Sequence, residues 1–152
     1  MNYAETPTYD LGPPMADGAW AGWSSWAGSE PFEEFIGPLY AKRDADGRMI
    51  TGCLAEPKLM NGGGGVHGGA LLSLADYSLF MLAYDELRGL HSVTVTLTGE
   101  FLAAAPQGAR LIGRGEVVKA GRSLLFVRGL LEVEGDPVLN FSGVLKIVRP
   151  RS

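Results

Sequence analysis

The sequence is short of the residues from which many sites are built. Among its 152 residues are one cysteine, Cys53, and two histidines. A single cysteine excludes an intramolecular disulfide and a metal site made of several cysteines. Two histidines without a neighbouring acidic cluster argue against a metal site of any kind. We expect Cys53 to be a small buried residue in a strand.

An excess of positive charge is also missing. Lysine and arginine number 13 against 17 aspartate and glutamate, which gives a net charge of -4 and no basic footprint for nucleic acid. The most apolar segment is interrupted by Ser73, Asp76 and Ser78, so no membrane span is predicted. Residues 1–10 lack a basic segment followed by an apolar run, and we therefore expect no signal peptide and a cytoplasmic protein.

The chain length suits one domain with a core. We divide it into an N-terminal arm over residues 1–30 and a domain over 31–152. Residues 1–18 are rich in Pro, Gly and Asp and are expected to be poorly ordered. Short helical turns are predicted around the three tryptophans and the segment after Pro31. We interpret the tryptophans as packing residues, with a ligand pocket as the alternative.

The rest of the chain predicts one helix and six strands. Patterns over 39–44 and 48–56, joined at Asp46-Gly47, indicate a hairpin. A helix over 70 to about 87 is apolar on nearly every face and ends at Arg88-Gly89. The other strands are predicted over 91–102, 111–119, 123–133 and 138–148. This order predicts an α+β fold whose antiparallel sheet wraps one long central helix.

A glycine-rich run precedes that helix. Asn61 is followed by four glycines, Val66 and then His67-Gly68-Gly69. Glycines just ahead of a helix leave its first N–H groups accessible to negative charge. No Gly-Lys-Ser/Thr follows, so a phosphate-binding loop is disfavoured. Asp76 lies further along an otherwise apolar helix, where a carboxylate needs a functional reason. These groups predict a site that stabilises an oxyanion and supplies a nucleophile or base.

These residues and this order of elements resemble the hotdog-fold acyl-CoA thioesterases, and most of all the PaaI-type (phenylacetyl-CoA thioesterase-like) family, over residues 31–149. The resemblance rests on Asn61, His67-Gly68-Gly69, Ser73-Leu74-Ala75-Asp76 and Gly121-Arg122-Ser123. It implies hydrolysis of an acyl-CoA to free acid and CoA, with no cofactor beyond the CoA of the substrate. It also implies a double-hotdog homodimer, with a homotetramer left open.

The resemblance also implies roles for single residues. Asp76 matches the catalytic carboxylate, nucleophile or general base, and the Gly68 N–H matches the oxyanion donor. Asn61 matches the side chain that positions water or acyl group, His67 the residue that orients the loop, and Thr94 a residue that helps hold the water. We expect the substrate to be bound by Gly69, Ser73, Tyr77, Phe80, Arg122 and Ser123, of which Arg122 is the candidate phosphate contact.

The spacing of Gly68 and Asp76 predicts an assembly. Eight residues at a rise of ~1.5 Å place them about 12 Å apart along one helix. One carbonyl group cannot then contact both. Two antiparallel helices related by a two-fold axis would bring each Asp76 to the other subunit's Gly68. We therefore predict a C2 dimer with two composite sites.

Two other functions compete with hydrolysis. A non-catalytic acyl-CoA binding or sensing protein would use the same loop and pocket. A hotdog dehydratase or hydratase would need a histidine and an acid poised over the acyl chain, and no such arrangement is evident. Asp76 is the discriminating residue, because a binding protein has little use for a buried carboxylate beside a thioester.

Overall fold

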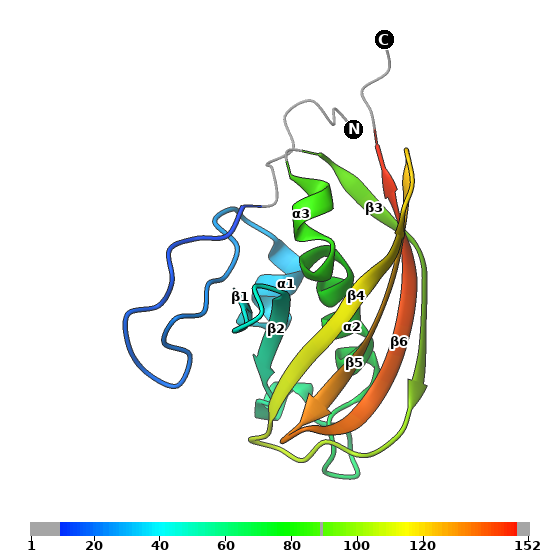
Figure 1. Ribbon diagram of the computed structural model, residues 1–152. Coiled ribbons are helices and arrows are strands. Elements are labelled where there is room, and N and C mark those ends of the chain that lie inside the picture. The colour runs from blue at the N-terminus through cyan, green and yellow to red at the C-terminus, as the bar shows by residue number, and fades with distance from the viewer. Residues whose placement is uncertain (1–9, 89, 149–152) are drawn as a thin grey trace.

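The computed structural model describes residues 10–88 and 90–148 and contains one antiparallel sheet of six strands (Figure 1). The strand order is β1-β2-β4-β5-β6-β3. The strands are β1 (Leu39–Arg43), β2 (Met49–Leu54), β3 (Ser92–Phe101), β4 (Arg110–Ala120), β5 (Leu124–Val133) and β6 (Asp136–Ile147). The helices are α1 (Pro31–Ile36), the 3-10 helix η2 (Pro57–Leu59), α2 (Gly68–Leu82) and α3 (Tyr84–Leu87).

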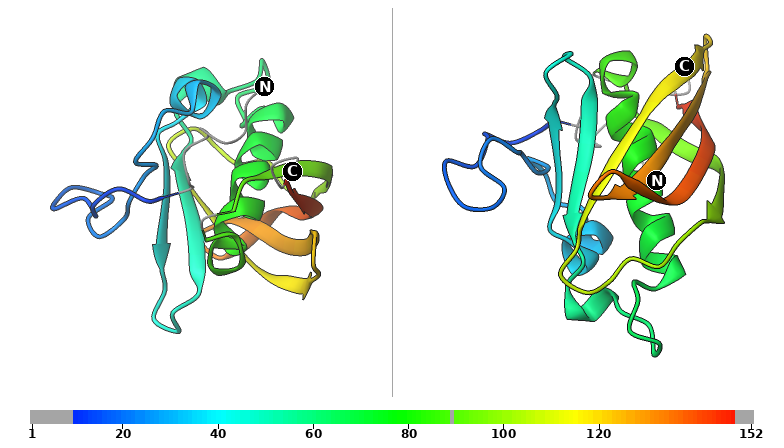
Figure 2. Two further views of the ribbon diagram at one scale, coloured as in Figure 1. Left: turned by 90° about the horizontal axis from the view of Figure 1, so that it is seen from above. Right: turned by 60° about the horizontal axis from the view of Figure 1, so that its bottom comes forward.

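The sheet curves around α2, which contacts β2 through β6 (Figures 1 and 2). This enclosure explains why the helix is apolar on nearly every face, since few of its sides meet water. Its fully enclosed side chains include Leu74, Tyr77, Leu79 and Met81. The predicted α+β fold, a sheet around one long helix, is confirmed.

Strand glycines let the sheet approach the helix this closely. A Cβ built on Gly143 of β6 would lie 2.3 Å from Leu79 Cδ1 and 2.7 Å from the Thr96 carbonyl oxygen. One of these neighbours belongs to α2 and the other to the backbone of β3. Glycine is therefore required at a point where helix, β3 and β6 meet.

All six predicted strands are present, and every end lies within two residues of the expected one. The single helix predicted over 70–87 is wrong in two respects. Helix α2 begins earlier, at Gly68, because the His67 side chain caps it. It stops at Ala83, whose φ of -96° and ψ of 16° leave the helical region, and α3 follows as a separate helix.

The N-terminal arm is better ordered than expected. Residues 1–9 lie outside the described residues, but the expected disorder of 10–18 is wrong for the part near Leu11. Gly12 N–H donates to Ser25 O at 2.7 Å, and Met15 N–H donates to Trp23 O at 2.8 Å. These bonds fold the arm back on itself beside β1. The boundary at residue 30 stays a prediction.

All three tryptophans are packing residues, as interpreted, and the partly buried Trp26 packs against the main core. Trp20 and Trp23 are 7% and 5% exposed and form a small apolar cluster with Tyr40 and Ile50. Of the predicted helical turns in this region, only α1 is a helix. Trp26 lies apart from the pair and contacts α2 through Tyr77.

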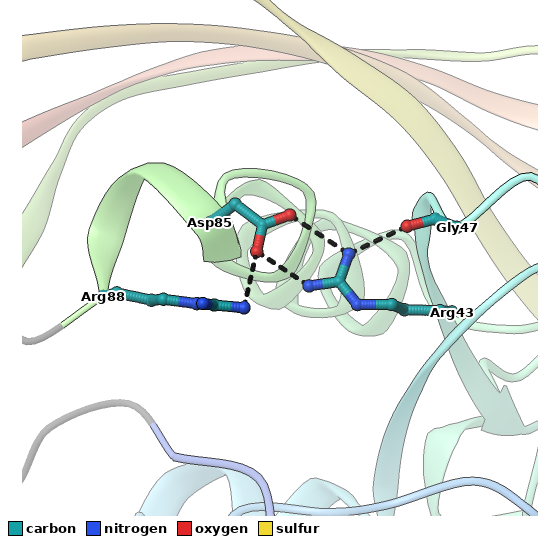
Figure 3. A network of polar contacts seen from close by, with 4 residues as sticks. All are labelled: Arg43, Gly47, Asp85 and Arg88. Carbon is teal, nitrogen blue, oxygen red and sulfur yellow. Dashed lines mark hydrogen bonds and ion pairs between the residues drawn. The ribbon is translucent and has the colours of Figure 1, made fainter.

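An ion-pair network ties the β1–β2 hairpin to the end of the helical segment (Figure 3). Arg43 of β1 binds both carboxylate oxygens of Asp85 in α3, at 2.7 and 3.0 Å, and also donates to the Gly47 carbonyl at 2.8 Å. Arg88 lies 3.1 Å from the same carboxylate. The Arg43 hydrogen bonds hold the pKa of Asp85 below its usual value. The network is exposed, so we assign it orientation rather than much stability.

Strand β3 forms one edge of the sheet and is hydrogen-bonded only to β6. It is ten residues long, and Val93 and Val95 are exposed along it. Long unpaired edges with apolar side chains invite pairing with another strand.

No helix among the described residues is long and apolar enough to cross a membrane.

The contact at Gly143 gives a test of the helix–sheet packing. We expect Gly143→Ala to lower the free energy of unfolding by about 1–3 kcal/mol, because the new methyl group overpacks Leu79 and the β3 backbone. Urea unfolding measures this. Gly62→Ala is the matched control: no atom lies within 4 Å of a Cβ there, and its effect should stay within about 0.5 kcal/mol. Equal effects of the two substitutions would contradict the packing argument.

Candidate active site

The glycine-rich loop is organised by Asn61. Its Oδ1 accepts hydrogen bonds from Gly63 N–H at 2.8 Å and Gly65 N–H at 3.2 Å. The Asn61 backbone N–H also donates to Gly65 O at 2.8 Å. Gly64 has a φ of +85°, a conformation that glycine adopts at little cost. The loop is thus a closed turn whose shape depends on the asparagine side chain.

The loop leads into the N-terminus of α2. Nδ1 of His67 accepts from Gly69 N–H at 2.9 Å, which caps the helix. In a neutral imidazole this leaves the proton on Nε2. Among the described residues the Gly68 N–H has no hydrogen-bond acceptor. It is therefore an open donor at the positive end of a helix.

The Phe101 ring covers Gly68 from the end of β3. A Cβ on Gly68 would lie 3.1 Å from Phe101 Cζ. A side chain at this position would therefore crowd the ring as well as the space in front of the N–H. Glycine suits a donor that a substrate must approach closely.

Asp76 lies half-buried on α2 and is bound by β3. Thr94 Oγ1 donates to Asp76 Oδ1 at 2.7 Å. Burial raises the pKa of Asp76, and the Thr94 hydrogen bond opposes that shift by stabilising the carboxylate. The result is a carboxylate of increased basicity held in one orientation.

Gly68 and Asp76 belong to the same uninterrupted helix, α2. The rise of an α-helix separates them by about 12 Å along its axis. Within one chain the structure therefore contains two groups, Asp76 with Thr94 and the Asn61–His67–Gly68 turn.

Comparison with known proteins identifies the family of this chain. Residues 63–139 match the family model described as the thioesterase superfamily. Protein PA0474 of Pseudomonas aeruginosa, which is named provisionally as an esterase, is 30% identical over 120 residues, covering 78% of this chain and 90% of that protein. The chain belongs to the thioesterase superfamily.

Other relatives agree with this membership. Human acyl-coenzyme A thioesterase 13 is 27% identical over 95 residues, covering 62% of this chain and 68% of that protein. A variant of phenylacetic acid degradation protein PaaI from Thermus thermophilus shares the fold with a TM-score of 0.68 and 24% identity, over 78% of this chain and 100% of PaaI. The BH2602 protein from Bacillus halodurans, solved with CoA, has a TM-score of 0.67 and 24% identity, over 73% of this chain and 74% of that one.

The expected thioesterase family is thereby confirmed, and the expected hotdog fold is the one shared with PaaI. The protein is a thioester hydrolase. The family match begins at residue 63, so the N-terminal arm, α1 and the β1–β2 hairpin lie outside it.

The remaining predicted residues of this thioesterase are dispersed. Ser73 Oγ donates to Gly69 O at 2.8 Å, which is a bond to the helix backbone. Tyr77 is 1% exposed, and Phe80 packs against the core. Arg122 and Ser123 lie exposed in the β4–β5 turn, at the end of the sheet opposite the glycine-rich loop (Figure 1). Within one chain, Arg122 and Ser123 are therefore not brought to Gly68.

Sequence reasoning missed a pair that the tertiary structure places near Asp76. Trp26 Nε1–H donates to a carboxylate oxygen of Glu33 in α1. Burial, followed by smaller effects that include the charge of Asp76, raises the pKa of Glu33 to about 7. The only signal in the sequence was an acid inside the aromatic segment PFEEFI. No group of His, Cys, Asp and Glu that could hold a metal ion occurs among residues 10–88 and 90–148.

The Thr94 hydrogen bond yields a pH prediction. Thr94→Val removes a donor that stabilises the charged form of Asp76, so the pKa of Asp76 should rise. We expect the acidic limb of the kcat/KM profile for thioester hydrolysis to move to higher pH, with about a fivefold loss at the acidic side.

A matched control is Thr98→Val, since Thr98 is on the same strand but bonds Ser142 at an exposed position. Its pH profile should follow that of the wild type. Identical profiles for Thr94→Val and the wild type would show that this bond does not tune the pKa of a carboxylate that hydrolysis depends on.

Proposed function

We propose that this thioesterase hydrolyses acyl-CoA thioesters to a free acid and CoA, with Asp76 as the catalytic carboxylate. The observation that carries the proposal is the half-buried Asp76 held by Thr94 at 2.7 Å. A carboxylate made more basic by burial is suited to take a proton or to attack a carbonyl carbon. The name of the human relative and the CoA in the Bacillus halodurans structure support this substrate class.

Two routes use the same groups. As a general base, Asp76 removes a proton from water, whose oxygen attacks the thioester carbon. As a nucleophile, Asp76 attacks the carbon itself and forms a mixed anhydride that water then hydrolyses. In both routes negative charge develops on the carbonyl oxygen, where the Gly68 N–H stabilises it. The C–S bond then breaks, the thiolate of CoA leaves, and it takes up a proton.

The two groups meet only between two subunits in this proposal. The separation of about 12 Å along α2 prevents one Gly68 and one Asp76 from sharing a carbonyl group. Pairing of the open β3 edges about a two-fold axis would set two α2 helices antiparallel. Each Asp76 would then face the partner subunit's Gly68. The unpaired edge of β3 and its exposed valines support this dimer, and a tetramer of such dimers is compatible with it.

The same geometry gives Arg122 a role. The β4–β5 turn lies at the opposite end of the sheet from its own glycine-rich loop (Figure 1). Antiparallel pairing would bring this turn toward the partner's loop. There the exposed Arg122 would meet a phosphate of CoA, the only cofactor-like group that the reaction needs. A cytoplasmic location, where CoA thioesters are made and consumed, is part of this proposal.

The composite site is tested by complementation between two inactive variants. Asp76→Asn removes the carboxylate, and Gly68→Pro removes the N–H. Proline is compatible with the backbone here, because Gly68 is the first residue of α2 and His67 before it is extended, with φ of -62° and ψ of 137°. We expect each variant alone to lose at least about 100-fold in kcat.

Mixing the two variants at equal amounts, after unfolding and refolding together, should restore activity. Random pairing makes half of the dimers mixed, each with one intact site of two, so about one quarter of wild-type activity is expected. No recovery, with mixed dimers demonstrated by mass spectrometry, would exclude the composite site. Full activity of Asp76→Asn would exclude its catalytic role, whereas a wild type that binds acyl-CoA without hydrolysing it would favour the binding or sensing protein.

Arg122 is tested separately. Arg122→Ala should raise KM for an acyl-CoA by about fivefold to tenfold with little change in kcat, because a phosphate contact is lost. The matching N-acetylcysteamine thioester, which lacks the nucleotide, should be unaffected. Arg48→Ala, an exposed arginine in the β1–β2 hairpin turn, is the control. Equal loss on both thioesters would contradict nucleotide recognition.

A further inference from the structure

A cavity of ≈ 260 Å³ lies between the N-terminal arm, α1 and the start of β1. Its wall includes Ser25, Trp26, Glu33, Pro38 and Leu39. All of these residues precede residue 63, where the match to the thioesterase family begins. The cavity is therefore a feature of this chain's N-terminal part, and nothing above assigns it a role.

The wall carries three carboxyl groups, of which Glu30 and Glu34 are exposed and Glu33 is half-buried. Trp26 Nε1–H donates to Oε2 of Glu33, which fixes the carboxyl group against the indole. No hydrogen bond is found from the described residues to its other oxygen, Oε1. Burial is the main cause that raises the pKa of Glu33 to about 7. Near neutral pH this carboxyl group can thus both donate and accept a hydrogen bond.

One residue of the cavity wall, Trp26, contacts the helix that carries the proposed catalytic carboxylate. Trp26 packs edge-on against Tyr77, with ring centroids 5.7 Å apart, and Tyr77 follows Asp76 directly in α2. Glu33 lies near enough to both for charge to act between them: Asp76 contributes to the raised pKa of Glu33, and Glu33, after burial, contributes to the raised pKa of Tyr77.

Tyr77 adds a second unused polar group. Its hydroxyl is buried and has no hydrogen-bond partner among the described residues. A buried hydroxyl without a partner is costly. Tyr77 is not itself a lining residue of the cavity, and it meets the wall through Trp26.

We propose that this cavity is the acyl subsite of the thioesterase and that Glu33 makes it selective for acyl groups ending in a hydroxyl. The inference rests on the proposed acyl-CoA hydrolysis. The volume of ≈ 260 Å³ suits a medium-chain or single-ring acyl group. Trp26, Pro38 and Leu39 face its apolar part, and Glu33 binds the terminal hydroxyl.

The test compares matched substrates. We measure kcat/KM for hexanoyl-, octanoyl- and decanoyl-CoA and for the ω-hydroxy form of each. At the chain length that fits, the wild type should favour the hydroxylated substrate by about tenfold. Glu33→Met should bring this ratio close to one while hydrolysis of the plain acyl-CoA persists. Glu33→Gln, which keeps a hydrogen-bonding amide, should retain part of the preference.

Glu86→Met is the control, because Glu86 is an exposed acid of α3 away from the cavity wall; its ratio should equal that of the wild type. Should Glu33→Met fail to fold, Trp26→Phe replaces it: the ring stays against Tyr77, the N–H that holds Glu33 is gone, and the ratio should fall.

Hydrolysis of all substrates with equal kcat/KM for plain and hydroxylated chains would overturn the subsite and leave the proposed function intact. An unchanged ratio in the folded Glu33 or Trp26 variant would also overturn it. Absence of hydrolysis for every acyl-CoA would instead overturn the proposed function, and this inference with it.

Discussion

The enclosure of α2 by the curved sheet is the constraint on which the rest of the structure depends. A helix that is apolar on most sides is stable only when those sides are covered. Five strands cover it, and glycines such as Gly143 let the backbone come close enough. Because the helix is enclosed on most sides, every functional group on it is held at a fixed position along its axis.

The proposed catalytic groups lie on the few parts of α2 that the sheet leaves open. At its start, His67 caps the helix through Gly69 N–H and leaves the neighbouring Gly68 N–H without an acceptor. About two turns further along α2, Asp76 accepts a hydrogen bond from Thr94 of β3. The same rigidity that orients both groups also keeps them apart, which is why the proposed catalysis by this pair calls for a second subunit.

The N-terminal part packs against this helix and sheet at two places. Trp20 and Trp23 cover the outer side of the β1–β2 hairpin through Tyr40 and Ile50. Trp26 turns the other way, onto Tyr77, and positions Glu33. A region outside the family match thus reaches the helix that carries Asp76, through the contact of Trp26 with Tyr77.

The sequence by itself determined the six strands, the apolar helix and the candidate groups Asn61, His67, Gly68 and Asp76, because periodicity and glycine placement are local signals. Helix ends were less predictable, since the break at Ala83 and the start at Gly68 depend on capping and packing. Only the tertiary structure decided that Thr94 meets Asp76, that Phe101 covers Gly68 and that Glu33 joins Trp26. These contacts join residues from different elements, and no local pattern encodes how a curved sheet brings distant side chains together.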